Sequence, residues 1–314
     1  MARIEARGRL CTPVSQSRSP FLRHPLLLAP LLALAAPACA QPAPAQDADP
    51  ALWVVKDDDT TIYLFGTIHV LKPGLSWFDE AVKTAFDDSQ TLVLEMVEPD
   101  AATQQKVVGA KAFAPDAAPL TQRIQPKYRT TFTQAIGKTG LPATMYDKMR
   151  PWFAAVSLSV LPVQELGYQP QNGPEAVLTQ AARAAGKPVE GLETFEGQLS
   201  IFDALSDKAQ VQLLESTLDE LPTAATTMQK MVADWSKGDP DALAKDMNET
   251  LKDSPEVARA LLTERNKRWA GWIAQRMTQP GTVFVAVGAG HLAGPESVQS
   301  MLGQYKLKAV RVKY

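Results

Sequence analysis

Short apolar segments that alternate with helical segments are the feature that most restricts how this sequence can fold. Residues 61–70 ("TIYLFGTIHV") and 91–97 ("TLVLEMV") have the composition of buried β-strands. Residues 76–89 between them carry apolar residues at helical spacing, with Ser76 as the predicted N-cap. A strand–helix–strand unit implies a parallel strand pair with a right-handed crossover. The sequence therefore predicts an α/β fold with at least one βαβ unit.

The C-terminus repeats this arrangement, with a strand over 282–291, a helix over 294–304 and a strand over 308–314. Residues 52–55 are expected to form a hairpin with 61–70, and 187–193 to form a strand after a helix over 174–186. Helical periodicity covers 119–136, 150–165, 197–216 and 222–279. We therefore expect a mixed, partly parallel sheet built from N- and C-terminal βαβ units, with a large helical subdomain inserted over about 100–280.

Residues 1–40 have the pattern of a secretory signal peptide. Arginines precede the apolar run "PLLLAPLLALAAPA", which ends at "ACA", so we expect cleavage after Ala40. The run is too short for a membrane span and contains Pro30, so no transmembrane segment is expected in the mature chain. The predicted organisation is a signal peptide (1–40), a flexible linker (41–50) and one domain (51–314). The predicted location is periplasmic or secreted, and lipidation at Cys39 is the less favoured alternative.

Cysteine and charge exclude several function classes. The sequence has 2 cysteines, Cys11 and Cys39, and both leave with the predicted leader. The mature chain would then have no disulfide, no thiolate metal site and no cysteine nucleophile. The net charge of the full chain is -2. Cleavage of the leader would also remove its arginines, which makes the mature chain more acidic. An acidic domain without a basic cluster is not expected to bind nucleic acid.

The histidines occur in one repeated spacing. Of the 3 histidines, His24 lies in the leader, whereas His69 ends "GTIH" and His291 ends "GAGH", each after a predicted strand. Glu95 and Glu193 also fall at predicted strand ends. Ligands bind outside the carboxyl ends of parallel strands, so these four side chains would form one site if their strands are neighbours.

Two imidazoles and one or two carboxylates suit a divalent transition metal with open positions for water, which the metal would convert to a nucleophile.

Other interpretations stay open for each residue. A histidine near a glycine is commonly a packed, hydrogen-bonded residue, Glu95 could end a buried strand, and Glu193 could begin a helix. Arg265 and Asn266 have the pattern of a solvated helix face. His-Glu-x-x-His, Gly-x-Ser-x-Gly, P-loop and Gly-x-Gly-x-x-Gly motifs are all absent from the sequence.

Taken together, several segments resemble the TraB/GumN family over about residues 50–314. They are "LWVVKDDDTTIYLFGTIHVL", "LVLEMVE", "RPWFAA", "GKPVEGLETFEGQL", "ERN" and "VFVAVGAGHLAGPESV". That family is similar to the Tiki-type metal-dependent proteases and, more distantly, to erythromycin esterases and a haem-binding lipoprotein group. The resemblance implies a divalent metal, manganese or cobalt with zinc as the alternative, and hydrolysis of a peptide or ester bond. It assigns His69, Glu95 and His291 to the metal or catalytic set, and it makes Arg265 and Asn266 candidates for orienting substrate or stabilising an oxyanion.

Three functional hypotheses follow. The first is an exported metal-dependent hydrolase, most simply a peptidase, with Glu95 as ligand or general base and Glu193 as a further ligand. The second is an esterase-like hydrolase without metal, in which one histidine activates water with the help of Glu95. The third is a protein that binds haem or a metal without turnover. Peptides and small-molecule esters are the expected substrates, and the sequence leaves the oligomeric state open.

Overall fold

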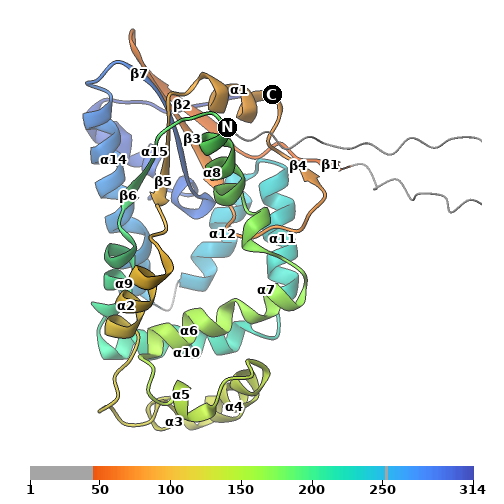
Figure 1. Ribbon diagram of the computed structural model, residues 1–314, viewed down its shortest axis with the longest axis vertical. Coiled ribbons are helices and arrows are strands. Elements are labelled where there is room, and N and C mark those ends of the chain that lie inside the picture. Colours follow the sequence, from red (N-terminus) through yellow and green to blue (C-terminus); the bar gives the residue numbers. More distant parts are fainter. Residues whose placement is uncertain (1–44, 252–253) are drawn as a thin grey trace, which may run out of the picture. The chain divides into compact units, whose positions relative to one another are not determined.

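Six strands of the computed structural model form one mixed sheet in the order β6-β5-β7-β3-β2-β8 (Figure 1). The structure describes residues 45–251 and 254–314, so the predicted signal peptide and its cleavage site lie outside the described residues. The strands of this sheet are β2 Leu52–Lys56, β3 Thr60–Thr67, β5 Thr91–Met96, β6 Val189–Glu193, β7 Gly281–Gly288 and β8 Val310–Arg311. A smaller parallel sheet pairs β1 Gln46–Asp47 with β4 Leu75–Ser76. The predicted mixed α/β fold is confirmed.

The central strands are almost continuously apolar in sequence because side chains of other elements cover both faces of the sheet. Phe65, Leu92 and Phe284 point to one face, where they join a core that includes Trp77, Phe86, Leu178 and Trp235. Ile62, Leu64, Val93, Val283 and Val285 point to the other face and pack with Trp269 and Ile273. Helices on both faces therefore hold β3, β7 and β5 in the middle of the fold.

Fifteen α-helices lie in the described residues. They are α1 Glu80–Asp88, α2 Ala101–Lys111, α3 Leu120–Arg123, α4 Arg129–Lys138, α5 Ala143–Tyr146, α6 Pro151–Ser159, α7 Leu161–Glu165, α8 Pro174–Ala184, α9 Phe195–Asp203, α10 Asp207–Glu220, α11 Ala224–Ser236, α12 Pro240–Leu251, α13 Pro255–Ala258, α14 Glu264–Arg276 and α15 Val298–Met301. A π-helix, Arg259–Thr263, joins α13 to α14. The 3-10 helices are Pro126–Tyr128, Pro170–Asn172, Ala289–Leu292 and Leu302–Tyr305.

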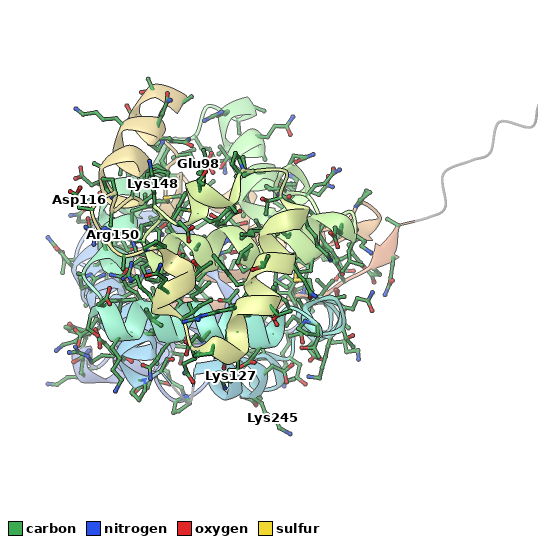
Figure 2. All side chains as sticks on the ribbon, turned by 90° about the horizontal axis from the view of Figure 1, so that it is seen from below. Glu98, Asp116, Lys127, Lys148, Arg150 and Lys245 are labelled. Atoms are coloured by element: carbon green, nitrogen blue, oxygen red, sulfur yellow. The ribbon has the colours of Figure 1, made fainter. Side chains whose placement is uncertain are left out.

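A third core lies away from the sheet. Phe132 of α4, Tyr146 of α5, Leu158 of α6 and Leu214 of α10 are fully or almost fully buried together. Figure 1 shows α6 and α10 side by side beyond the carboxyl end of β5, with α3, α4 and α5 on their far side. Seen from that end, the surface carries charges of both signs, including Asp116, Lys148 and Arg150 (Figure 2). The described residues contain no helix long and apolar enough to cross a membrane.

The strand order differs from the one expected for adjacent βαβ pairs. β7 lies between β3 and β5 and is parallel to both, so the two strands joined by α1 are not neighbours. β8 pairs antiparallel with β2 instead of lying beside β7. The sequence could identify the strands, but their order depends on packing between distant segments.

Two local predictions are corrected. Ser76 was expected to cap a helix but lies in β4, and α1 begins only after Asp79, whose side chain accepts a hydrogen bond from Ser76 Oγ. The linker was expected to reach residue 50, yet Gln46–Asp47 form β1 and Ala48 is buried. Backbone pairing with β4 explains the difference, because composition alone cannot reveal a partner strand.

Candidate functional site

The pairing of β3 with β7 brings the two Gly-x-x-His motifs together. The strands are parallel and in register from Thr60 opposite Gly281 to Thr67 opposite Gly288. β5 lies on the other side of β7, with Leu94 opposite Ala286, and β6 follows with Glu193 opposite Met96. The condition on which the predicted site depended, that these strands be neighbours, is therefore met.

Both motif glycines stand where a side chain would be tightly crowded. A Cβ on Gly66 would lie 3.1 Å from Cα of Ala289, and one on Gly288 would lie 3.0 Å from Oε1 of Glu95. The Gly288 position also faces both histidines, since its Cβ would lie 3.7 Å from a carbon of the His291 ring and 3.8 Å from a carbon of the His69 ring. Glycine at both positions thus lets the strand ends approach closely without displacing these neighbours.

His69 lies just after β3 and is held by a carboxylate. Its Nδ1 lies 2.7 Å from Oε1 of Glu175, which also accepts a hydrogen bond from Thr67 Oγ1 at 2.6 Å. The hydrogen bond with Glu175 raises the pKa of His69 to about 9 against the opposing effect of burial. Burial would raise the pKa of Glu175, but the bonded His69 outweighs it and lowers that pKa. The His69 side chain is nevertheless 71% exposed, so solvent reaches the ring.

His291 has the opposite surroundings. It lies in the 3-10 helix after β7, its side chain is only 6% exposed, and its ring contacts Trp269 with centroids 4.4 Å apart. Nδ1 lies 2.6 Å from Oδ1 of Asn266, whose amide nitrogen donates to the Glu296 carbonyl at 2.7 Å. An amide oxygen only accepts, so Nδ1 carries the proton and Nε2 keeps its lone pair. Burial lowers the pKa of His291 to about 3, which leaves the ring neutral.

Arg265 lies between the acidic and imidazole groups. Its Nη1 is 2.9 Å from Nε2 of His291, its Nη2 is 2.5 Å from Oε2 of Glu95, and its Nε donates to both Glu193 oxygens at 3.0 and 3.2 Å. Every nitrogen of the guanidinium thus contacts an acceptor of the protein. The group is 9% exposed and stacks on Trp269 at 4.6 Å. This geometry supports a positioning role better than donation of a hydrogen bond to substrate.

Both carboxylate oxygens of Glu95 also accept hydrogen bonds from the protein. Oε1 accepts from the Gly288 backbone N–H at 2.7 Å, and Oε2 accepts from Gln198 at 3.2 Å as well as from Arg265. Burial would raise the pKa of Glu95, but the facing His291 and Arg265 groups outweigh it and lower the value to about 2. A carboxylate of such low basicity is a poor general base at neutral pH.

A π-helix precedes the two candidate site residues of α14. The π-helical turns Arg259–Thr263 lead directly into Glu264, and the Leu261 carbonyl accepts a hydrogen bond from Arg265 at 3.3 Å. Thr263 Oγ1 also donates to Glu296 at 2.5 Å. π-helical turns occur frequently at functional sites, because the extra residue per turn changes the direction of the side chains that follow. Here it precedes the turn that carries Arg265 and Asn266.

The residues as arranged do not fit a metal ion. Among the described residues, no group of three or more histidine, cysteine, aspartate or glutamate side chains is placed to hold one. The cause is Arg265, whose guanidinium contacts the lone pairs of His291, Glu95 and Glu193 that a metal would use. In this arrangement an arginine side chain, and not a metal ion, supplies the positive charge that faces His291, Glu95 and Glu193.

The structure gathers every predicted site residue at one sheet edge, although Glu193 pairs with Arg265 and Arg268. Sequence reasoning missed Glu175, Thr67, Gln198 and Arg268. Glu175 follows Pro174 in the first turn of α8, where an acidic residue is common for reasons of helix capping and dipole alone. Nothing in the sequence signalled that α8 begins beside His69.

Two proteins and one family model are similar to this chain in sequence. A protein named YbaP from Escherichia coli strain K12, described as uncharacterized, is 26% identical over 253 residues, which cover 81% of this chain and 92% of that protein. An uncharacterized protein of Treponema pallidum strain Nichols is 21% identical over 272 residues, 81% of this chain and 80% of its own length. No solved structure matches the chain. The model of the TraB/PrgY/gumN family matches residues 51–311, and the chain belongs to that family.

Proposed function

We propose that this protein is a hydrolase of peptide or ester bonds in which His69 transfers the proton. The observation that carries the proposal is the His69–Glu175 contact, an imidazole held through Nδ1 by a carboxylate while its side chain stays open to solvent. A histidine held in this way presents Nε2 to a bound water, and the carboxylate stabilises the imidazolium that forms. The pair lies at the carboxyl edge of parallel strands, where substrates of such sheets bind.

The proposed step is general-base hydrolysis. Neutral His69 takes a proton from water, whose oxygen attacks the carbonyl carbon, and the imidazolium returns the proton to the leaving amine or alcohol. Glu95, Arg265, Asn266 and His291 form a buried network beside it, which holds the ends of β5, β7 and α14 in place.

The test is the pH profile of turnover with fluorogenic peptides and p-nitrophenyl esters. Because the pKa of His69 is raised to about 9, kcat/KM should increase with pH up to that region. His69→Ala should lower kcat/KM by about 10²–10⁴-fold, the range of a general base, and Glu175→Gln should move the rise to lower pH. Full activity in His69→Ala would refute the proposal. A fall of kcat/KM over the same pH range would assign His69 as an acid.

A metal-dependent hydrolase, with manganese or cobalt, is the second candidate. The observation in its favour is that both histidines are held through Nδ1, which leaves Nε2 as the ligand atom, as in many metal sites. Arg265 would first have to leave its contact with His291. Elemental analysis of protein purified without chelators tests this candidate. Near-stoichiometric metal that is lost in the His69→Ala/His291→Ala variant would support it, and activity that survives exhaustive chelation would exclude it.

We propose further that the protein acts in the periplasm or outside the cell. The signal-peptide pattern of residues 1–40 is the support for this location. Cell fractionation tests it, together with mass determination of the mature chain. A mature chain that begins at residue 41 is expected, a lipidated chain would begin at Cys39, and an uncleaved cytoplasmic chain would contradict the proposal.

A further inference from the structure

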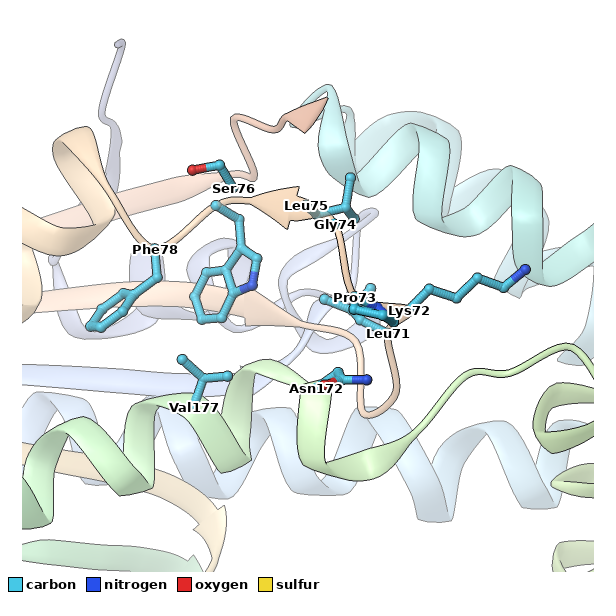
Figure 3. Close-up of a pocket in the computed structure, with 10 residues that line it drawn as sticks. Leu71, Lys72, Pro73, Gly74, Leu75, Ser76, Phe78, Asn172 and Val177 are labelled. Atoms are coloured by element: carbon cyan, nitrogen blue, oxygen red, sulfur yellow. The ribbon is translucent and has the colours of Figure 1, made fainter. Parts of the chain in front are cut away.

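A cavity of about 290 Å³ lies between the loop that follows β3 and the beginning of α8. Figure 3 shows Phe78 and Val177 towards one end of it and Leu71 and Pro73 towards the other. The lining combines apolar side chains with polar groups, and it also includes Lys72, Gly74, Leu75, Ser76, Trp77 and Asn172. We call it the Trp77 cavity. Its size is near the lower end of the range for small-ligand pockets, so it suits a single side chain better than a large cofactor.

The cavity presents an unused hydrogen-bond donor. Trp77 is only 5% exposed as a residue, and its indole nitrogen, which makes no hydrogen bond to the described residues, stays accessible at the cavity. An indole N–H is a donor only, so at the wall of a cavity it can donate to an acceptor on whatever binds there. A ligand in the cavity that carries a carbonyl oxygen would supply this acceptor.

The wall of the cavity is also a free strand edge. β1 bonds to β4 through the carbonyls of Gly74 and Ser76, which accept from Gln46 at 2.7 Å and Ala48 at 2.9 Å. Backbone groups alternate in direction along a strand, so those of Leu75 point away from β1. No other strand of the described residues pairs with β4. An extended peptide could add to this edge, as peptides do at exposed sheet edges in other proteins.

The same two chain segments build the cavity and the His69–Glu175 pair. Leu71 is two residues from His69, which limits their Cα separation to about 7 Å. Asn172 precedes Gly173, where an added Cβ would lie 2.3 Å from the His69 carbonyl oxygen. Glu175 and Val177 then follow in the first turns of α8. A group bound in the cavity is thereby kept near the proton-transfer pair.

We propose that the Trp77 cavity is a specificity pocket for a bulky apolar side chain, such as leucine or phenylalanine, on a peptide that lies extended along β4. Its use in catalysis rests on the hydrolase function proposed above, but its binding preference does not. Lys72, the cation of the lining, is positioned over the Tyr168 ring at 4.7 Å, and no carboxylate lines the cavity to receive a basic side chain. Burial of an apolar side chain is therefore the main source of selectivity.

The test measures binding apart from turnover. Fluorescein-labelled, blocked peptides of the form Ala-Ala-Xaa-Ala-Ala, with leucine, phenylalanine, glycine, aspartate or lysine at Xaa, are titrated into the His69→Ala chain and followed by fluorescence anisotropy. The leucine and phenylalanine peptides should bind at least about tenfold more tightly than the glycine and aspartate peptides. Val177→Phe, which fills the cavity, should abolish this preference. Val156→Phe is the matched control, because Val156 is an exposed valine on α6.

A second variant keeps the test decisive if Val177→Phe fails to fold. Trp77→Phe retains an aromatic ring and removes the donor, so it should weaken all the peptides by about three- to tenfold, the value of one hydrogen bond, with little change in their ranking. Equal affinity for all five peptides, or a preference that survives Val177→Phe, would overturn the pocket assignment. Selective binding without hydrolysis by the chain that retains His69 would support the pocket and contradict the proposed function instead.

Discussion

The two Gly-x-x-His motifs end neighbouring parallel strands, yet their histidines have opposite surroundings. The His69 side chain is 71% exposed and bonded to the carboxylate of Glu175, whereas that of His291 is 6% exposed and lies between Asn266 and Arg265. The pKa of His69 is raised to about 9 by its hydrogen bond, and that of His291 is lowered to about 3 by burial. The same Gly-x-x-His spacing thus places His69 where it is suited to proton transfer and His291 where it is suited to positioning other side chains.

The change with the largest expected effect on stability is Arg265→Ala, which disrupts the buried network around His291. Without the guanidinium, the carboxylates of Glu95 and Glu193 stay buried without their main positive partner. Removing one member of a buried ion pair costs about 3–5 kcal/mol, which urea denaturation would measure. Arg268→Ala is the control, because Arg268 contacts the same Glu193 but is 54% exposed, so it should cost less than about 1 kcal/mol.

His291→Ala and His69→Ala compare the two motifs directly. His291→Ala leaves Asn266 and Arg265 without their shared partner inside the core, and we expect a loss of about 2–3 kcal/mol in the free energy of unfolding. His69→Ala should cost less than about 1 kcal/mol, because its ring is open to solvent and its ion pair is screened. Equal losses in the two variants would contradict the division into positioning and proton-transfer residues.

Acid should destabilise the fold through His291 before it does so through Glu95. The pKa of His291 falls from 6.5 to about 3 on folding, so the unfolded chain binds the extra proton and stability is lost as pH decreases through that window. Each such proton contributes a slope of up to about 1.4 kcal/mol per pH unit. Glu95, whose pKa is lowered from 4.5 to about 2, adds to the loss below pH 4.5. Unfolding free energies measured from pH 7 to 3 should therefore be flatter in His291→Gln.

The smallest effect on stability is expected from Glu175→Gln. Its amide still accepts the Thr67 hydroxyl but removes the charge that favours protonated His69, so the pKa of His69 should return towards 6.5. The raised pKa of His69 makes the pair's contribution to stability largest below pH 6.5 and removes it as pH increases through about 9. Exposure of the ring keeps this contribution small. Thermal unfolding at pH 6 and pH 10 should accordingly differ little between the variant and the parent chain.

Several residues of the candidate site could be singled out from the sequence because they follow local patterns. Apolar runs identify β3, β5 and β7, and Glu95, His69 and His291 come at or just after the ends of these strands. These features depend on one segment at a time, which a single sequence displays.

The partners of those residues depend on distant segments and could not be read in the same way. Arg265 and Asn266 look like the solvated face of a helix, and only packing of α14 against the sheet buries them. The π-helix before them has no composition signal of its own. Glu175 has an ordinary place in the first turn of α8, so its contact with His69 emerges only once α8 is placed.

A histidine titration followed by nuclear magnetic resonance tests the central claim most directly. The sequence contains 3 histidines, so the ring signals can be assigned with His69→Gln and His291→Gln variants. We expect the His69 ring to titrate near pH 9 and to carry a proton on both nitrogens at neutral pH. The His291 ring should stay neutral, with its proton on Nδ1, down to about pH 3 or until the protein unfolds. Two rings that titrate together near pH 6.5 would contradict the assignment of different roles to the two motifs.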